Sequence, residues 1–203
     1  TVEFLFDDLT GEFWFLEVNT RLQVEHPVTE EVTGIDLVSE QLKVARGEKL
    51  QFSQDDIKWN GSAIEARLYA EDPNNDFLPE IGTLIAFEKD PTIDARWDTG
   101  VSKGTIVGTD FDPMLAKIIT YAPNRTDAAS KLAKALESAH IGGVKTNRDF
   151  LVNCLKTTEF IKGDTTSDFI DRVDPARKLV IQKESLEHAT AIAALWIQES
   201  NRM

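Results

Sequence analysis

The stretch FLEVNTRLQVEHPVTEE at residues 15–31 decides how this chain is to be interpreted. Polar side chains occupy every second position of its first half, with mostly apolar residues between them. In a β-strand, alternate residues project from the same face. The polar positions are Glu17, Asn19, Arg21, Gln23 and Glu25. Five such groups are costly to bury and unusual as a purely solvated face, so the pattern predicts a functional site.

The length of this segment limits how the site is arranged. At about 3.3 Å per residue, a fully extended strand would place Glu17 and Glu25 roughly 26 Å apart, too far to meet one small substrate. We therefore expect the strand to end near Asn19 and the rest to curl as a loop held by His26 and Pro27, with His26 in a structural, hydrogen-bonding role. Glu17 and Asn19 would then serve one centre, and the loop residues an adjoining one.

The residue types in this stretch fit two kinds of ligand. Glu17 and Asn19 offer hard oxygen ligands of the kind that Mg²⁺ prefers, and Glu3 on the partner strand is the natural third ligand. Arg21 presents a planar fork that matches bicarbonate, a carboxylate or a phosphate. Glu25, beside a bound anion, could act as a base. From spacing alone, solvated strand residues and a surface salt bridge remain open as alternatives for these positions.

Composition excludes several classes of protein. The chain carries 35 acidic against 22 basic residues, a formal net charge of −13, which would repel a nucleic-acid backbone. We expect no nucleic-acid and no membrane role, since no apolar run approaches the roughly 20 residues that a membrane helix needs. The single cysteine, Cys154, rules out an internal disulfide and fits the cytoplasm or a mitochondrial matrix. Its apolar neighbours indicate a buried residue.

The elements around this stretch predict an α+β fold. Apolar runs at 2–6 and 13–18, separated by a turn-rich segment, predict an antiparallel hairpin. Apolar residues at helical spacing predict a helix over 34–47. Alternation over 63–69 predicts a strand whose polar face carries Arg67 together with Glu65 and Tyr69.

The second half of the chain predicts a mostly antiparallel sheet with packed helices. The expected strands cover 83–88, 93–97, 104–107 and 115–121. One expected helix begins at Thr126, and two more cover 147–157 and 166–172. A last helix is capped by Ser185 and carries apolar residues along one side, namely Leu186, Ala189, Ala193 and Trp196. This last helix should be separate from the main fold. The expected domains are residues 1–60, 61–173 and 174–203.

The string EVNTRLQVEHPVTE at residues 17–30 resembles the signature of the biotin carboxylase family. The resemblance continues through GSAIEARLYAEDP, FLPEIGTL, DFDPMLAKII and HIGGVKTN, so it covers about residues 1–172. It implies the C-terminal part of an ATP-grasp fold, followed by the C-terminal domain of a biotin carboxylase. The expected activity is ATP- and bicarbonate-dependent carboxylation of biotin on a carrier, by way of carboxyphosphate.

The resemblance also implies which residues bind the substrates. Glu3, Glu17 and Asn19 would hold the Mg²⁺ or Mn²⁺ ions that bridge the phosphates of ATP. The implied bicarbonate pocket consists of Arg21, Gln23 and the backbone of Val24.

Four further positions match the family. Glu25 resembles the base that deprotonates bicarbonate, and Arg67 the arginine that stabilises negative charge on the ureido oxygen of biotin. Asp112 is a candidate to orient Arg67 in the biotin site. Arg96 resembles a position of the homodimer interface and is not expected to be catalytic.

The expected partners are a biotin carboxyl carrier domain, a carboxyltransferase subunit and a second copy in a homodimer. Residues 179–203 resemble the start of an extension found in α-chains of acyl-CoA carboxylases, and pyruvate or urea carboxylase is the alternative. Because the chain opens directly on a strand and lacks the Gly-rich lid of the family, we expect a fragment with no measurable ATP cleavage of its own. A non-catalytic dimerisation or docking module is the contrasting interpretation. Carbamoyl phosphate synthetase is a weaker rival, because residues 63–121 do not resemble it.

Overall fold

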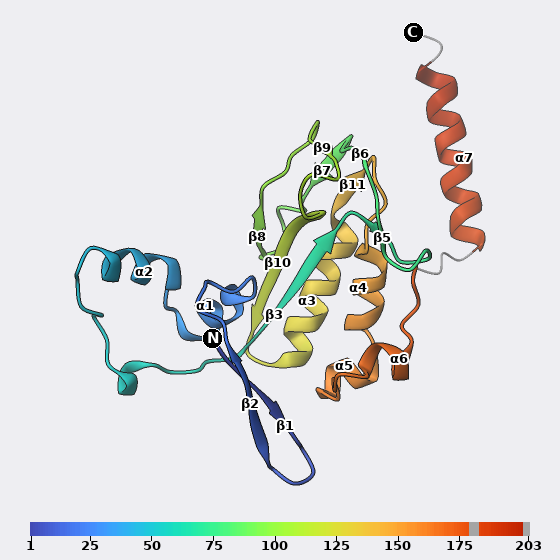
Figure 1. Ribbon diagram of the computed structural model, residues 1–203. Helices are drawn as coiled ribbons and strands as arrows, with labels where there is room; N and C mark the ends of the chain where they lie inside the picture. The colour runs from blue at the N-terminus through green and yellow to red at the C-terminus, as the bar shows by residue number, and fades with distance from the viewer. Residues whose placement is uncertain (179–182, 201–203) are drawn as a thin grey trace.

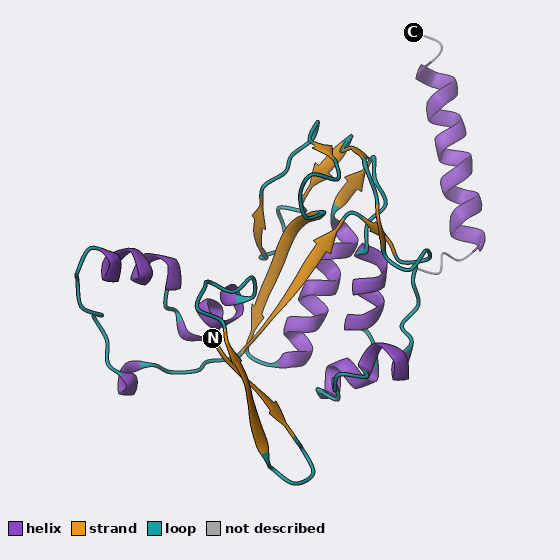
Figure 2. Ribbon diagram, viewed as in Figure 1, coloured by secondary structure: helices purple, strands orange, loops and turns teal. Residues whose placement is uncertain are grey.

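The computed structural model describes residues 1–178 and 183–200, except for the side chains of 183, 184 and 195–200 (Figure 1). The strands are β1 (Val2–Phe6), β2 (Phe13–Val18), β3 (Ser62–Tyr69), β4 (Glu71–Asp72), β5 (Leu78–Pro79), β6 (Gly82–Thr83), β7 (Ala86–Glu88), β8 (Arg96–Thr99), β9 (Ile106–Val107), β10 (Met114–Ala122) and β11 (His140–Gly142). The helices are α1 (His26–Thr33), α2 (Leu37–Ala45), a short 3-10 helix (Gln54–Asp56), α3 (Arg125–Ser138), α4 (Arg148–Leu155), α5 (Thr158–Lys162), α6 (Phe169–Val173) and α7 (Lys183–Ser200). The α+β class expected from the sequence is confirmed (Figure 2).

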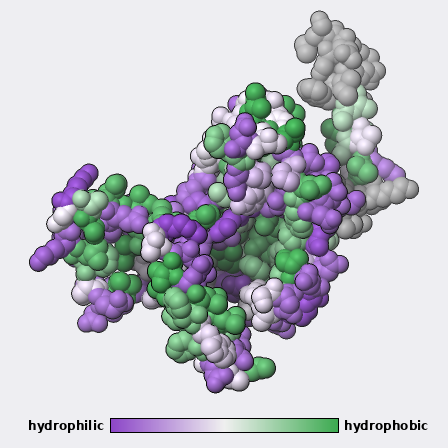
Figure 3. Space-filling view, in the orientation of Figure 1, coloured by the Kyte–Doolittle hydropathy of each residue, from purple (hydrophilic) through white to green (hydrophobic). Residues whose placement is uncertain are grey.

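The predicted hairpin is present as β1 and β2, which pair antiparallel and project from the rest of the molecule (Figure 1). The Asp7 carboxylate accepts hydrogen bonds from the backbone N–H groups of Leu9 and Thr10 and so fixes the connecting turn. Apolar side chains on both strands are exposed, and the ring of Phe4 packs edge-on against those of Phe13 and Phe15. Figure 3 shows this apolar surface over the hairpin.

A three-stranded antiparallel sheet in the order β3-β10-β8 forms the centre of the body. Helices α3 and α4 lie side by side against one of its faces, and α1 packs against β3 and β10 (Figure 2). The alternation predicted for β3 is observed, since Ile64, Ala66 and Leu68 are buried while Arg67 is exposed. Thr120 on β10 donates to the carbonyl of Ala128 on α3, so its buried hydroxyl is satisfied.

The loop predicted around His26 and Pro27 is wrong in part, because helix α1 occupies these positions. The strand does end at Val18 and a loop follows, but a helix starts at His26. Proline is compatible with the first turn of a helix because the N–H that it lacks has no partner there. Gly34, with a φ of 73°, ends the helix in the left-handed region.

Several other boundaries differ from those expected. The helix predicted over 34–47 is shorter, because Asp36 caps α2 by accepting from the backbone of Ser39. Asn124 caps α3, which starts at Arg125, one residue before the predicted start. Strand β8 is shifted toward the C-terminus of the expected segment, and the short elements β4, β5, β11 and α5 were not anticipated. Cys154 is buried, which confirms its interpretation, and burial raises the pKa of its thiol to about 11.

Helix α7 stands apart from the body (Figure 1). Ser185 lies inside this helix and is not its cap, which corrects the expected boundary. Leu186, Ala189 and Ala193 are exposed, while the side chain of Trp196 lies outside the described residues. In the part of the chain that the structure describes, no helix combines the length and apolar character that crossing a membrane requires.

Candidate functional site

Two carboxylates face each other at the open end of the hairpin. Glu3 of β1 lies directly opposite Glu17 of β2. Like charges placed opposite each other destabilise a strand pair unless something compensates. The side-chain amide of Asn19 donates to a carboxylate oxygen of Glu3 and, at 3.3 Å, to Oε1 of Glu17. The three predicted metal ligands therefore converge on one small volume.

The loop after β2 holds a second group of polar side chains beside the first. Arg21 donates through Nη1 to Oε1 of Gln23 at 2.6 Å and through Nη2 to Oδ1 of Asn19 at 3.2 Å. Gln23 in turn donates to Glu3 at 3.3 Å. The ring Nδ1 of His26 lies 2.7 Å from the carbonyl oxygen of Gln23, which confirms the structural role expected for His26. The predicted anion-binding residues thus form one network with the predicted metal ligands.

Glu25 and Arg67 are brought together although 42 residues separate them. Nη2 of Arg67 donates to Oε2 of Glu25 at 2.7 Å. Their side chains are 43% and 51% exposed, and an ion pair this open contributes little to stability. The pairing therefore serves the arrangement of the site more than the free energy of folding.

Lys117 is a site residue that the sequence analysis missed. From β10 its Nζ donates to the backbone carbonyl of Val24 at 3.1 Å and lies 3.3 Å from the Asp98 carboxylate. This hydrogen bond holds the loop that carries Arg21 and Glu25 against the central sheet. The signal that could have found it is a lysine in the middle of the apolar strand MLAKIITYA.

Glu65 is a second residue whose importance was not recognised. Its side chain is 4% exposed, and neither carboxylate oxygen has a hydrogen-bond partner in the described part of the chain. Burial raises the pKa of this carboxyl group from its ordinary value of 4.5 to about 7, while the positive charges of Lys117 and Arg67 oppose the shift.

Asp112 makes a local backbone contact and forms no ion pair with Arg67 among the described residues. Its carboxylate accepts from the backbone N–H of Met114 at 2.9 Å, and among the described residues the ion-pair partners of Arg67 are Glu25 and Glu65. The orienting role of Asp112 therefore stays a prediction. Arg96 binds Glu30 and Asp98 and lies outside this cluster of side chains.

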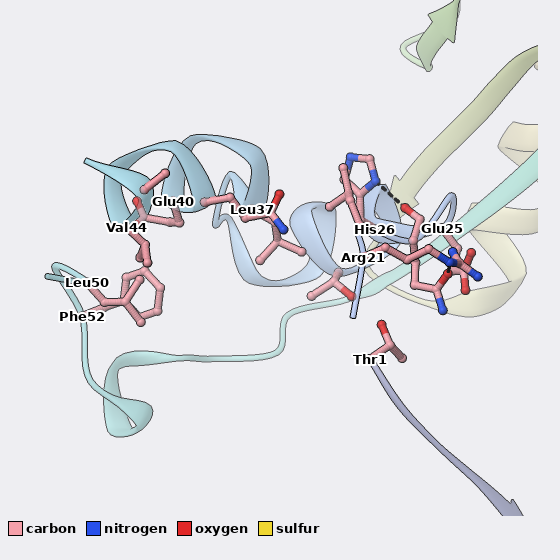
Figure 4. A pocket seen from close by; sticks show the side chains of 14 residues that line it. Thr1, Arg21, Glu25, His26, Leu37, Glu40, Val44, Leu50 and Phe52 are labelled. Carbon is pink, nitrogen blue, oxygen red and sulfur yellow. Dashed lines mark hydrogen bonds between the residues drawn. The ribbon is translucent and has the colours of Figure 1, made fainter. Parts of the chain in front are cut away.

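A cavity of about 750 Å³ opens between the loop and α2 (Figure 4). Arg21 and Glu25 line its polar end, while Val44, Leu50 and Phe52 line the opposite, apolar end. The cavity is far larger than a bicarbonate ion, so the polar end alone is the part that fits such an anion.

Comparison with known protein families identifies the family to which this chain belongs. Residues 65–172 match the family described as biotin carboxylase C-terminal domain. The chain belongs to the biotin carboxylase family. Residues 1–53 match the ATP-binding domain of the carbamoyl-phosphate synthase L chain, the ATP-grasp part of the fold. The match over 65–172 separates the chain from the carbamoyl phosphate synthetase alternative.

Similar proteins are biotin carboxylases and biotin-dependent carboxylases. Biotin carboxylase 2 of Bacillus subtilis is 48% identical over 170 residues, which cover 84% of this chain and 38% of that protein. The mitochondrial propionyl-CoA carboxylase alpha chain of Homo sapiens is 41% identical over 217 residues, which cover 100% of this chain and 30% of that protein. The chain therefore spans well under half the length of these relatives.

A solved structure gives the same family. The biotin carboxylase domain dimer of the Hydrogenobacter thermophilus 2-oxoglutarate carboxylase, in complex with MgADP, ADP and bicarbonate, superposes with a TM-score of 0.84. Its sequence is 38% identical, and the match covers 89% of this chain and 40% of that one. This chain therefore shares its fold with part of that biotin carboxylase domain.

Divalent cation binding can be tested on this chain alone. Glu3, Glu17 and Asn19 provide two carboxylates and an amide, a set that suits Mg²⁺ or Mn²⁺ because these ions share the remaining positions with water and phosphates. We expect Mn²⁺ at about ten times its dissociation constant to stabilise the chain by about 1.4 kcal/mol. Glu17→Gln should abolish this gain and also raise the melting temperature without metal, because it removes the carboxylate facing Glu3.

Thermal unfolding with and without Mn²⁺ measures both effects. Glu12→Gln, the same substitution in the exposed hairpin turn, is the matched control and should retain the full gain. A gain of equal size in Glu17→Gln would show that the cation binds elsewhere.

Proposed function

We propose that this chain forms the metal, bicarbonate and biotin-binding part of a biotin carboxylase. The complete enzyme would use ATP, Mg²⁺ or Mn²⁺ and bicarbonate to carboxylate biotin on a carrier domain. The observation that carries the proposal is the convergence of Glu3, Glu17 and Asn19 with Arg21 and the other loop residues into one hydrogen-bonded network.

Each group of side chains has a separate task in this reaction. A divalent ion held by Glu3, Glu17 and Asn19 would neutralise the phosphate charge of ATP. Arg21, through its guanidinium fork, would bind bicarbonate together with Gln23 and the backbone of Val24. The amide oxygens that now accept from Arg21 already hold its guanidinium in a fixed direction, so little side-chain entropy would be lost on binding.

Glu25 and Arg67 would act in sequence on the two substrates. Glu25 would accept the proton of bicarbonate, whose oxygen then attacks the γ-phosphate to give carboxyphosphate and ADP. Carboxyphosphate breaks down to CO₂ and phosphate, and the phosphate removes the ureido N–H proton of biotin. Arg67 would stabilise the negative charge that develops on the ureido oxygen, and the ureido nitrogen then attacks CO₂.

The proposed setting is an acyl-CoA carboxylase. The match to the human propionyl-CoA carboxylase alpha chain extends over the whole chain, including the segment that contains α7, whereas the match to the Bacillus biotin carboxylase covers 84% of it. We propose a carrier domain, a carboxyltransferase subunit and a homodimer as partners, and the cytoplasm or a mitochondrial matrix as the location. The proposed domain boundaries remain 1–60, 61–173 and 174–203.

Assaying the complete product of the open reading frame that encodes this chain tests the function. We expect ATP hydrolysis that requires bicarbonate, together with transfer of ¹⁴C from bicarbonate to free biotin or to a biotinylated carrier. This chain alone should show neither activity. Absence of both bicarbonate-dependent ATP hydrolysis and ¹⁴C transfer in the complete protein would refute the proposal and leave a non-catalytic docking module as the remaining interpretation.

A further inference from the structure

Glu65 is a buried acidic side chain to which the proposed reaction gives no task. Its carboxylate is almost fully removed from solvent, and neither oxygen receives a hydrogen bond within the described residues. Burying a carboxylate in this way is costly unless nearby charges compensate. The position of Glu65 in the sheet shows where that compensation comes from.

The sheet register places two positive charges beside Glu65. Arg67 of β3 lies directly opposite Lys117 of β10, an arrangement that like charges disfavour. Glu65 lies opposite Ile119, so it is diagonal to Lys117 and two residues before Arg67 on the same face. The Nε atom of Arg67 is 3.9 Å from Oε1 of Glu65. The buried carboxylate therefore lies beside both cations, two residues from Arg67 on its own strand and diagonal to Lys117 on the neighbouring strand.

Each of these cations holds a different part of the site. Arg67 reaches Glu25 at 2.7 Å, and Lys117 binds the backbone carbonyl of Val24 at 3.1 Å. We infer that Glu65 is a positioning residue. Its buried negative charge holds Arg67 beside Glu25, and it holds Lys117 against the backbone carbonyl of Val24. This inference rests on the proposed function, because it assigns Arg67 and Glu25 their tasks.

The contact between Glu65 and Arg67 restrains Arg67 at one end only, and we call this electrostatic restraint the tether. Because Glu65 attracts Arg67 without accepting a hydrogen bond from it, the terminal Nη groups of Arg67 remain available for Glu25 and for a substrate oxygen. A direct bidentate pair would instead occupy the guanidinium fork. Arg67 is thus restrained at its Nε end while its tip stays available to the site.

The strength of this tether depends on pH. The charged groups that act on Glu65 are Arg67 on its own strand, Lys117 on β10, Asp98 on β8 and Glu25 at the start of α1. With a pKa of about 7, Glu65 is neutral in mild acid and negative in mild base. The tether is therefore absent below neutral pH and present above it.

A neutral side chain of the same shape tests the inference. In the complete protein, we expect wild type and Glu65→Gln to carboxylate biotin at rates within about twofold of each other at pH 5, where only about 1% of Glu65 is ionised. Above about pH 8 the wild type should be roughly 10- to 100-fold faster, the loss expected when a catalytic group is misplaced. The ratio of the two kcat values should rise with a midpoint near pH 7, as the pKa of Glu65 requires.

The ratio separates positioning from a merely structural role, because a general loss of folded protein would lower the rate equally at every pH. Glu71→Gln is the matched control. Burial also raises the pKa of the Glu71 carboxyl group, but Glu71 forms no ion pair with Arg67 or Lys117 among the described residues. Its ratio to wild type should not vary with pH. A constant ratio for Glu65→Gln as well would overturn the inference.

A measurement on this chain alone keeps the inference distinct from the proposed function. The NMR resonance of the Arg67 Nε–H group should titrate near pH 7 in the wild type and lose that titration in Glu65→Gln. If the complete protein does not carboxylate biotin, the proposed function fails, yet this resonance still supports or refutes the tether. A resonance that titrates identically in both variants would refute it.

Stability supplies a second readout with a defined sign. The pKa of Glu65 is higher in the folded chain than its ordinary value of 4.5, so its contribution to stability is largest below about pH 4.5 and is lost as the pH rises through about 7. Urea unfolding should therefore show the wild type losing stability relative to Glu65→Gln over this window. A difference that does not change with pH would contradict the burial of an ionisable Glu65.

Discussion

Replacing Arg67 by glutamine is expected to slow biotin carboxylation by the complete protein roughly 10²- to 10³-fold, the usual effect of removing one group that stabilises a developing oxyanion. Glutamine still donates a hydrogen bond but carries no charge, so the ureido oxygen of biotin would lose its cation. The biotin-independent hydrolysis of ATP should persist, because Arg67 acts after bicarbonate has been activated. Steady-state rates with and without biotin measure this separation.

Stability should be nearly unchanged in this variant below about pH 6, where Glu65 is mostly protonated and needs no compensating charge. The ion pair between Arg67 and Glu25 is about half exposed, so its loss should change the free energy of unfolding by less than about 1 kcal/mol. Lys131→Gln, which removes a surface cation paired with Asp94 on the far side of the sheet, is the control and should carboxylate at the wild-type rate. Full activity of the Arg67 variant would remove Arg67 from the biotin site.

Replacing Glu25 by glutamine is expected to lower both activities together, by roughly 10²- to 10⁴-fold, because a general base of this kind contributes about that much. Deprotonation of bicarbonate precedes both ATP cleavage and carboxyl transfer, so the two rates should fall in parallel. This pattern differs from that of Arg67→Gln, where only the step that involves biotin slows. A variant that still hydrolyses ATP at the normal rate with bicarbonate would show that another group is the base.

The contact between the two residues allows a further check on the same variants. Because Glu25 and Arg67 are joined by a hydrogen bond of 2.7 Å, their substitutions should not act independently. The double variant should lose less activity than the product of the two single losses. Strict multiplication of the losses would mean that the pair does not persist in the working enzyme.

Much of the fold could be predicted because short-range patterns determine it. The hairpin strands follow from two apolar runs around a turn-rich segment. Strand β3 and the exposed position of Arg67 follow from alternation. Helix α1 was missed because Pro27 was interpreted as the end of a loop, although proline is also compatible with a helix start. The paired segments of two or three residues, such as β4 and β5, are too short to leave a periodic pattern.

Some residues of the site could also be predicted from local sequence patterns, and others could not. Glu3, Glu17, Asn19 and Arg21 were found because they lie in one hairpin and its following loop, so local spacing predicts that they meet. The roles of Glu65 and Lys117 depend on the register between β3 and β10, which pairs residues about 50 positions apart. No local pattern specifies which residue of one strand faces which residue of the other.

Asn19 couples the proposed metal ligands to the proposed bicarbonate pocket, because its one side-chain amide contacts both groups. Its nitrogen now faces the carboxylates while its oxygen accepts from Arg21. A bound cation would favour turning the Asn19 oxygen away from Arg21, so that Gln23 alone would keep the guanidinium oriented while its Nη2 group became open to an incoming anion. By thermodynamic reciprocity, bicarbonate must then tighten the cation by the same factor. Heterotropic cooperativity between the two ligands would therefore arise from the half-turn of one side chain, with no movement of domains.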